Sequence, residues 1–390
     1  ANGLTAVFPK LVFFVEKGLN QEKNDPNYDI KQLALECATK RLYPDIISAV
    51  NNRATTGSSV PVSPMGCRSF LSVWRDSDGN EVLDGRNNLG VITLNIPRIA
   101  IESGGDFAKF DTLFEERLAL AKRALDTRID RLRGVRAAVA PILYTEGAFG
   151  VRLKPEDEIL SLFKNGRSSI SLGYIGLHEA SIIMFGEAPT ENWAAQDFCV
   201  GLVQRMRNAT EKWKDESEEG WGYSLYATPS ESLCDRFCRL DYEKFGMIKG
   251  VTDKGWYMNS FHQDVYKHSN PFDKIDFESP YHTISSGGHI SYAEFPNIRQ
   301  NPDALETVWD YALSKLNYFG TNTPSDKCLM CHYEGEFKID SEGFHCPKCS
   351  NNDSKSMSVI RRVCGYLGAP NSRGFNRGKN LEVQHRVKHM

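Results

Sequence analysis

The sequence predicts an α/β protein, because short apolar runs alternate with longer segments of helical periodicity along most of the chain. This alternation is typical of β/α units around a mainly parallel sheet. A length of 390 residues exceeds the usual size of one domain and favours a large domain with a smaller appendage. Near 320–324 the alternation gives way to cysteine pairs and polar turns. We therefore expect a β/α part at 1–320, followed by two smaller segments at 321–355 and 356–390.

Candidate strands are the short apolar runs between these helical segments. The first apolar run, 4–15, begins almost at the first residue and indicates a buried strand, so we expect the chain to begin inside a fold, as a fragment. The segments that we expect to form strands are 6–15, 90–96, 137–143, 169–173, 222–227 and 255–259.

Two helices have clear sequence signals. The first covers 106–133, where leucine, alanine and isoleucine recur at helical spacing and Gly134 is placed to end the helix. The second begins at Asn301 and Pro302, a capping residue followed by proline at the first helical position. The apolar stripes of both helices predict core packing rather than a functional role.

Composition excludes several classes of protein. A net charge of -3 gives no general attraction to nucleic acid or to a membrane surface. The longest apolar runs are too short to span a bilayer and no signal peptide opens the sequence, which predicts a cytoplasmic protein without a membrane partner. The last residues carry Arg377, Lys379, Arg386 and Lys388, and we expect a solvated basic tail rather than a phosphate site.

Four of the ten cysteines have the spacing of a metal site. The pairs Cys328/Cys331 and Cys346/Cys349 are each of the form Cys-x-x-Cys, which is typical of a four-thiolate zinc ribbon. An iron–sulfur cluster, free thiols, or a ligand exchange with a neighbouring histidine are alternatives, but paired knuckles favour structural Zn²⁺. Acidic residues between the pairs argue against direct nucleic-acid binding by the ribbon.

Two further residues are ambiguous from their local sequence. Gly365 has the local features of a turn glycine, and Cys364 before it those of a buried thiol. Cys67 lies between Gly66 and Arg68 after a proline, which indicates a tight loop rather than a helix or strand. For the remaining cysteines we expect buried, unreactive thiols, namely Cys37, Cys199, Cys234 and Cys238.

Three segments could contact a substrate. Thr228, Ser230 and Ser232 stand where a strand ends and a helix begins, so they could bind phosphate or simply cap the helix. Glu231 would repel a phosphate and must face elsewhere. Asn87 and Asn88 could bind a substrate or close a turn. The loop 285–288 could close over a substrate or merely turn.

Several motifs together resemble the anaerobic (class III) ribonucleoside-triphosphate reductases, which are glycyl radical enzymes. The motif around Gly365 resembles the radical loop, and the ribbon just before it is similar to the reductase branch. The segments that carry the resemblance are FPKLVF at 8–13, DPNYD at 25–29, PMGCRSF at 64–70, DGRNNLG at 84–90 and RVCGY at 362–366.

The resemblance implies a fold, roles for named residues and a set of partners. The fold would be part of a ten-stranded α/β barrel with a C-terminal zinc ribbon and a glycyl radical loop. Gly365 would store the radical, and Cys67, at the tip of a loop in the barrel, would become the thiyl radical that takes the ribose 3′-hydrogen. A separate activating enzyme with an iron–sulfur cluster and S-adenosylmethionine would generate the radical, and formate would be the reductant.

The resemblance also implies what this chain lacks. Family members carry an N-terminal portion with the first half of the barrel and the allosteric site, so we expect that half as a partner, a homodimer of the complete subunit, and no activity for this chain alone. A formate-lyase-like enzyme is an alternative, but that branch uses adjacent cysteines and has no ribbon. A non-catalytic zinc-ribbon binding protein would leave Gly365 and Cys67 unexplained.

Overall fold

The computed structural model describes residues 4, 6, 8–340, 343–363, 365–370 and 375–389. The chain forms two compact units. Unit 1 comprises residues 1–52, 229–282 and 290–390, and unit 2 comprises 53–228 and 283–289. Among the described residues, no helix combines the length and the apolar character needed to cross a membrane. The division into 1–320, 321–355 and 356–390 stays a prediction.

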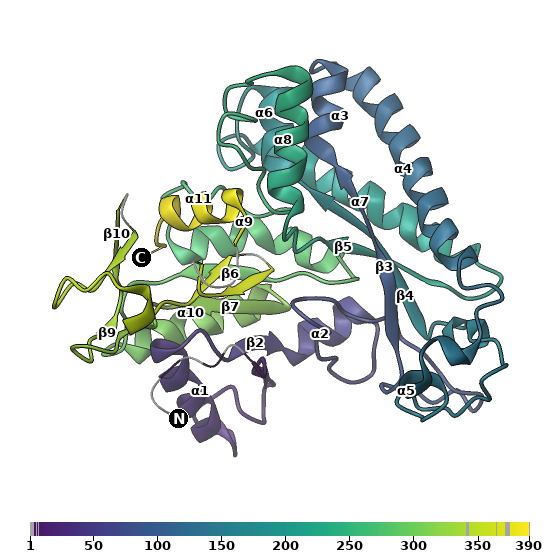
Figure 1. Cartoon of the computed structure of the whole chain (residues 1–390), viewed down its shortest axis with the longest axis horizontal. Helices are drawn as coiled ribbons and strands as arrows, with labels where there is room; N and C mark the ends of the chain where they lie inside the picture. Colours follow the sequence, from purple (N-terminus) through teal and green to yellow (C-terminus); the bar gives the residue numbers. More distant parts are fainter. Residues whose placement is uncertain are drawn as a thin grey trace. The chain divides into compact units, whose positions relative to one another are not determined.

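Unit 2 is built on a three-stranded parallel sheet. Its strands are β3 (Asn87–Asn95), β4 (Ser168–Ile175) and β5 (Gly222–Ala227), in the order β3-β4-β5. Helices α4 and α7 pack along this sheet (Figure 1). The helical elements are α3 (Ile96–Ser103), α4 (Phe107–Asp130), η1 (Ala137–Val139), α5 (Pro141–Tyr144), η2 (Leu160–Phe163), α6 (Leu177–Phe185) and α7 (Trp193–Asp215).

Unit 1 contains a mixed sheet of the order β1-β2-β7-β6. Strand pairs β1-β2 and β6-β7 are parallel, and β2 and β7 join them in an antiparallel contact. The strands are β1 (Val12–Val15), β2 (Asp45–Ser48), β6 (Ser291–Glu294) and β7 (Tyr318–Asn322). The larger helices are α1 (Tyr28–Lys40), α8 (Leu233–Phe245), α9 (Pro271–Ile284) and α10 (Pro302–Lys315), while α2 (Ala49–Thr56) runs from unit 1 into unit 2.

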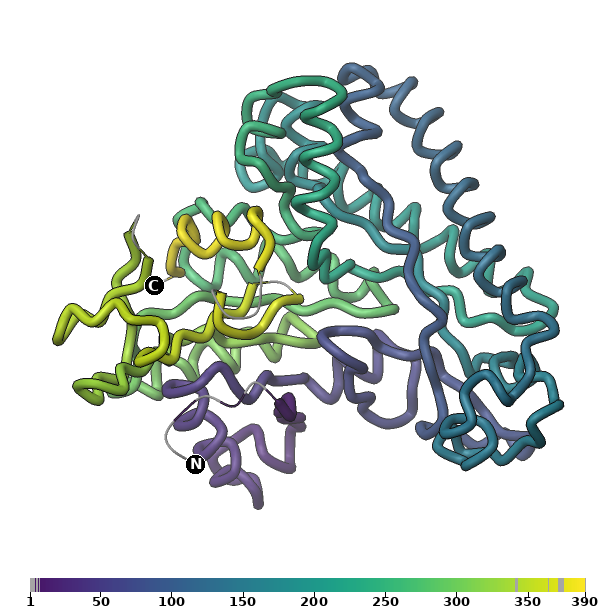
Figure 2. Tube along the Cα trace, in the orientation of Figure 1, coloured from purple at the N-terminus to yellow at the C-terminus, as the bar shows by residue number. Residues whose placement is uncertain are grey.

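The described C-terminal part of unit 1 consists of short strands, a short 3-10 helix and one α-helix. Strands β8 (Asp326–Cys328), β9 (Glu334–Gly335) and β12 (Met357–Ser358) form one small sheet. Two hairpins pair β10 (Lys338–Asp340) with β11 (Gly343–His345), and β13 (Arg361–Val363) with β14 (Tyr366–Gly368). The short helix η3 (Ser354–Ser356) precedes β12, and α11 (Arg377–His385) packs against β13 (Figure 2).

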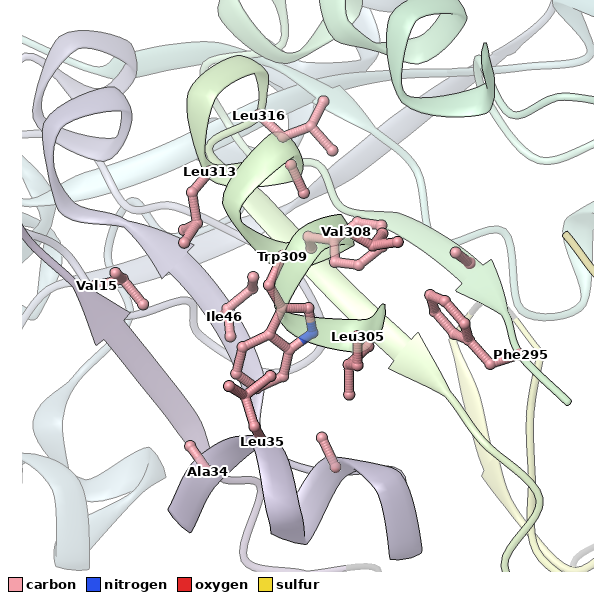
Figure 3. Close-up of a cluster of buried hydrophobic side chains, with 14 of the residues drawn as sticks. Val15, Ala34, Leu35, Ile46, Phe295, Leu305, Val308, Trp309, Leu313 and Leu316 are labelled. Carbon is pink, nitrogen blue, oxygen red and sulfur yellow. The ribbon is translucent and has the colours of Figure 1, made fainter. Parts of the chain in front are cut away.

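The core of unit 1 lies between helices α1 and α10 and the mixed sheet. Trp309 is at its centre, among side chains that include Leu35 and Leu305 (Figure 3). The indole Nε1 of Trp309 donates to Thr321 Oγ1 at 2.8 Å, so the one polar atom of this buried ring has a partner. The predicted stripe on α10 is thus core, as expected.

The two predicted helices are confirmed. Helix α4 begins after Asp106, whose carboxylate accepts from Lys109 N, and ends at Asp130, a few residues before Gly134. Helix α10 begins at Pro302, with Asn301 accepting from Ala304 N. Both helix starts follow from local capping chemistry.

The strand predictions are confirmed for 222–227 and, with longer bounds, for 90–96 and 169–173. The segment 137–143 is helical instead, because Pro141 starts a short helix inside the apolar run. The first strand covers only Val12–Val15, because its pairing partner β2 has only the four residues Asp45–Ser48. The segment 255–259 forms no strand.

Candidate active site and metal centre

The sheet of unit 2 has one apolar face and one polar face. Ile170 and Tyr223 pack with Leu125 and Ile129 of α4 in a buried cluster. The alternate residues of the same strands point the other way because side chains alternate along a strand. There Ser171 Oγ lies 3.2 Å from Ser224 Oγ. Val91 and Tyr226 lie on this face as well, so it combines serine hydroxyl groups with two larger side chains. The hydroxyl groups can contact a polar ligand or another polar loop.

The loop with Cys67 is attached to this polar face. Met65 and Ser69 exchange backbone hydrogen bonds of 2.7 and 3.2 Å, which leaves Cys67 in the tight turn between them. Ser72, a few residues further on, donates from its amide to Ser169 Oγ at 2.7 Å. The thiol residue is half-buried. The predicted tight loop is confirmed, whereas the role of Cys67 stays a prediction.

Glycines permit the loop to approach the strands so closely. A Cβ on Gly222 would lie 2.1 Å from Ser72 Oγ and 2.8 Å from the carbonyl oxygen of Ser168. A Cβ on Gly288 would lie 2.1 Å from the carbonyl oxygen of Arg68. Sequence reasoning missed this function of the glycines, because the partners that crowd them are distant in the chain.

The loop 285–288 is hydrogen-bonded both to the Cys67 loop and to β5. Gly288 forms bridges with both Ser69 and Tyr226, and Phe70 N donates to Gly287 O at 3.0 Å. His289 follows directly and its ring lies 5.4 Å from that of Phe70. This loop therefore supports the Cys67 loop.

Asn87 and Asn88 begin strand β3. Asn88 donates to Ser171 Oγ at 3.2 Å and accepts from Gly90 N at 2.7 Å, so its amide both contacts the polar face and closes a turn. The side-chain oxygen and nitrogen of Asn87 are buried without a hydrogen-bond partner in the part of the chain that the structure describes. Ser168 pairs with Asn87 in register, and its buried hydroxyl group also has no hydrogen-bond partner among the described residues. Buried polar groups of this kind indicate a missing partner or ligand.

The hydroxyl residues after β5 lie in different surroundings. Thr228 is the last residue of the 53–228 segment of unit 2, and its Oγ1 is 3.1 Å from that of Thr93. Ser230 is buried with φ +59°, and its carbonyl accepts from the amides of Leu233 and Cys234. Ser232 precedes α8 and is exposed, but its side chain makes no capping hydrogen bond. Two amides at this helix start are therefore already used within the chain.

Gly365 lies in the connection of the β13–β14 hairpin. Val363 pairs with Tyr366, so Gly365 comes directly before the second strand of the hairpin. The local prediction of a turn glycine is correct for its position, and Cys364 lies outside the described residues. Gly365 N donates to Pro229 O at 3.2 Å, and a Cβ on Gly365 would lie 2.6 Å from Glu231 Cγ. Close packing against Glu231 therefore favours glycine here.

The base of this hairpin is held by ion pairs. Arg362 is buried and donates to Asp45 at 2.5 Å. Burial alone would lower the pKa of Arg362, but the charge of Asp45 outweighs it and the pKa is raised. Arg361 forms two hydrogen bonds with Asp326, of 2.5 and 2.7 Å. Bidentate pairs of this kind fix orientation as well as position.

The prediction of a solvated basic tail is wrong for Lys379 and Arg386, although Arg377 is exposed as predicted. Lys379 is buried and donates to Glu382, and Arg386 pairs with Glu382 and Glu294. Arg386 also donates to the carbonyl oxygen of Arg362 at 2.9 Å. This part of the tail packs against β13, because its basic groups pair with Glu382 in the same helix and with the distant Glu294.

The four cysteines of the ribbon come together as predicted. Their sulfur atoms all lie within 4.8 Å of one another, with 3.7 Å between Cys328 and Cys349 and 3.5 Å between Cys331 and Cys346. A tetrahedral zinc with Zn–S bonds of about 2.3 Å requires sulfur separations of roughly 3.8 Å. His345 instead bonds Asp340 at 2.9 Å, which argues against a ligand exchange at that position. The donor set fits one structural Zn²⁺ ion.

The four cysteines that we expected to be buried and unreactive differ in their burial. Cys199, Cys234 and Cys238 are buried, as predicted, and burial raises the pKa of Cys199 to about 12. Cys37 is only half-buried, although burial again raises its pKa.

Comparisons with known proteins agree with this description. The family model described as "Anaerobic ribonucleoside-triphosphate reductase" matches residues 1–389. The proteins of that name from Enterobacteria phage T4 and from Escherichia coli (strain K12) are 59% and 58% identical over the whole chain. The chain covers 63% and 54% of their respective lengths.

Solved structures support the fold. A structure titled "Anaerobic ribonucleotide reductase" superposes with a TM-score of 0.64 at 19% identity, covering 98% of this chain and 55% of that one. A protein whose title concerns 1,2-propanediol dehydration in Roseburia inulinivorans has a TM-score of 0.57 at 10% identity, with 97% and 53% covered. The described residues form separate sheets in a mixed α/β arrangement.

Proposed function

Because the chain belongs to the anaerobic ribonucleoside-triphosphate reductase family, we propose that it is the part of such an enzyme that carries its radical residues. The observation that supports this most directly is that Cys67 and Gly365 each lie in a turn and are half-buried. Cys67 lies in a tight turn attached to a polar sheet face, and Gly365 lies in a hairpin turn packed against Pro229 and Glu231. The two residues belong to different units, so their cooperation is part of the proposal.

The proposed reaction is reduction of a ribonucleoside triphosphate to the 2′-deoxyribonucleoside triphosphate. The radical stored on Gly365 takes a hydrogen atom from the Cys67 thiol, and the thiyl radical takes the ribose 3′-hydrogen. The 2′-hydroxyl leaves as water after protonation. Formate supplies two electrons and is released as CO₂, so ribonucleotide, formate and a proton give deoxyribonucleotide, CO₂ and water.

The polar face of the unit 2 sheet is the proposed substrate surface. Asn88, which bonds Ser171 on this face, would contact the ribose. Asn87 pairs in register with Ser168, whose side chain lies on the other face of the sheet, so contact between the Asn87 amide and a substrate stays a prediction. Thr228, Ser230 and Ser232 would contact the phosphates. Because Leu233 and Cys234 amides already bond Ser230, hydroxyl groups rather than helix amides would provide most donors.

The proposed accessory groups are a structural zinc ion and several partners. Zn²⁺ at the four cysteines would stabilise the segment that leads into β13, because a small segment gains folding free energy from metal binding. A radical S-adenosylmethionine enzyme with an iron–sulfur cluster would form the radical. The missing portion of the relatives would complete the ten-stranded barrel, and the complete subunit would form a homodimer in the cytoplasm.

Oxygen sensitivity tests the radical assignment directly. After anaerobic activation, exposure to oxygen should cut the backbone at Gly365 and release a fragment that begins near Tyr366. The Gly365→Ala variant should stay intact and show no organic radical. Full reductase activity of that variant, in the presence of all partners, would disprove the proposal.

The need for the missing portion has its own test. We expect the 390-residue chain to be inactive by itself and to gain activity when combined with the corresponding N-terminal part of a relative. Turnover of a ribonucleotide by the activated chain alone would contradict this part of the proposal. An anaerobic radical doublet would also exclude a purely structural zinc-ribbon protein.

A further inference from the structure

The carbonyl group of Pro229 has two donors that come from distant parts of unit 1. Gly365 N donates to it at 3.2 Å, and the side-chain Nδ2 of Asn259 donates to it at 2.9 Å. Asn259 is 2% exposed, so its amide cannot exchange this partner freely for water. One oxygen atom thus connects a buried side chain to the peptide group of Gly365.

The orientation of Asn259 is itself set by a neighbour. Ser260 Oγ donates to Asn259 Oδ1 at 2.8 Å, which directs the amide nitrogen toward Pro229. Ser260 is buried and has φ +37°, an unfavourable backbone conformation for a residue with a side chain. A residue in such a conformation persists only where the surrounding structure stabilises it. Here that residue is Ser260, whose hydroxyl group orients the Asn259 amide.

The opposite end of the same short segment is also held. Asn376 Nδ2 donates to the carbonyl oxygen of Glu231 at 3.2 Å, while Asn376 Oδ1 accepts from Lys379 N and caps α11. The segment 229–231 is therefore fixed at both ends by side-chain amides. Gly365 packs against this segment, since a Cβ there would lie 3.3 Å from Pro229 Cβ.

We propose that Asn259 is a positioning residue for the radical glycine, acting through the carbonyl group of Pro229. This inference rests on the proposed function. A glycyl radical is stabilised when its Cα is coplanar with both neighbouring peptide groups. The hydrogen bond from Gly365 N fixes the plane on the amino side, and Asn259 fixes the acceptor of that bond.

Asn259→Leu tests the inference, because it removes the donor while preserving similar volume. Asn51→Leu is a matched control: Asn51 Nδ2 also donates to backbone carbonyls in unit 1, those of Leu313 and Leu316, but has no connection to Gly365. Amide hydrogen exchange of Gly365 should accelerate about fivefold in Asn259→Leu, the factor for a hydrogen bond of about 1 kcal/mol. It should be unchanged in Asn51→Leu.

Electron paramagnetic resonance of the activated protein, with its partners present, gives the second measurement. Asn259→Leu should change the splitting of the glycyl doublet or lower the radical yield per chain, and Asn51→Leu should not. Should Asn259→Leu fail to fold, Ser260→Ala keeps Asn259 but removes the hydroxyl that orients its amide, together with a longer contact to His262 Nδ1, and should change both measurements in the same direction.

The outcomes separate the two proposals. If the unsubstituted protein forms no radical, the proposed function fails. Hydrogen exchange at the Gly365 amide still tests whether Asn259 positions the Pro229 carbonyl group. If it forms the radical, but Asn259→Leu and Ser260→Ala leave exchange, splitting and yield unchanged, the positioning role of Asn259 is overturned.

Discussion

Substitution of Gly222 by alanine tests whether the Cys67 loop is seated on the sheet as described. The new Cβ would lie 2.1 Å from Ser72 Oγ, 2.9 Å from Ser72 Cβ and 2.8 Å from the carbonyl oxygen of Ser168. Ser168 is part of β4, so its carbonyl cannot move without disturbing the ladder. The loop residue Ser72 must therefore move.

The expected loss of stability follows from three contributions. Overpacking costs about 1–3 kcal/mol. Displacing Ser72 weakens its two hydrogen bonds to Ser169, both of 2.7 Å, which contribute about 1 kcal/mol each. Alanine in a strand regains about 0.5–1 kcal/mol relative to glycine. The net destabilisation is about 2–4 kcal/mol.

Urea unfolding of Gly222→Ala beside the unsubstituted chain measures this loss, provided that the m value is unchanged. Gly201→Ala is the control, because Gly201 lies within α7 and a Cβ there has no neighbouring atom within 4 Å. That substitution should stabilise the protein by up to about 1 kcal/mol. Ser72→Gly combined with Gly222→Ala should recover part of the loss. A Gly222→Ala protein as stable as the original would refute the described seating of the loop.

Three further predictions concern other parts of the chain. The purified chain should hold one zinc ion. Cys349→Ser should weaken zinc binding more than about 100-fold, which is more than the loss typical of substitutions that only support the ligands. Metal analysis during a chelator titration measures both. Burial lowers the pKa of His289 to about 4, below its usual value of about 6.5. Between these two pH values the unfolded chain binds a proton that the folded chain does not bind. The free energy of unfolding therefore falls as the pH decreases. Between pH 7 and 5 this loss is about 2 kcal/mol, and pH-dependent unfolding of His289→Gln should lack it. Trp309→Phe should lower the free energy of unfolding by about 1–3 kcal/mol, because it leaves the Thr321 hydroxyl without its donor. Adding Thr321→Val should recover about 1 kcal/mol in the same denaturant measurement, and no recovery would contradict that hydrogen bond.

Features coded by neighbouring residues were predictable. The start of α10 follows from Asn301 and Pro302, and the bounds 222–227 of β5 follow from one apolar run. Failures arose where a local pattern had two solutions. The apolar run 137–143 fits a strand by composition, yet Pro141 begins a helix there. Strand β2 (Asp45–Ser48) is too short for its periodicity to be distinctive, and it exists because β1 and β7 pair with it.

The sequence by itself determined the chemistry that is available: the four ribbon cysteines, a thiol in a tight turn and a glycine near the end of the chain. Their residue types and short spacings are sufficient for those predictions. Only the tertiary structure decided which distant groups meet, such as Asn259 with Pro229, and Arg386 with the strand before Gly365. The physical reason is that a hydrogen bond depends on the final distance between two atoms, which no spacing along the chain specifies.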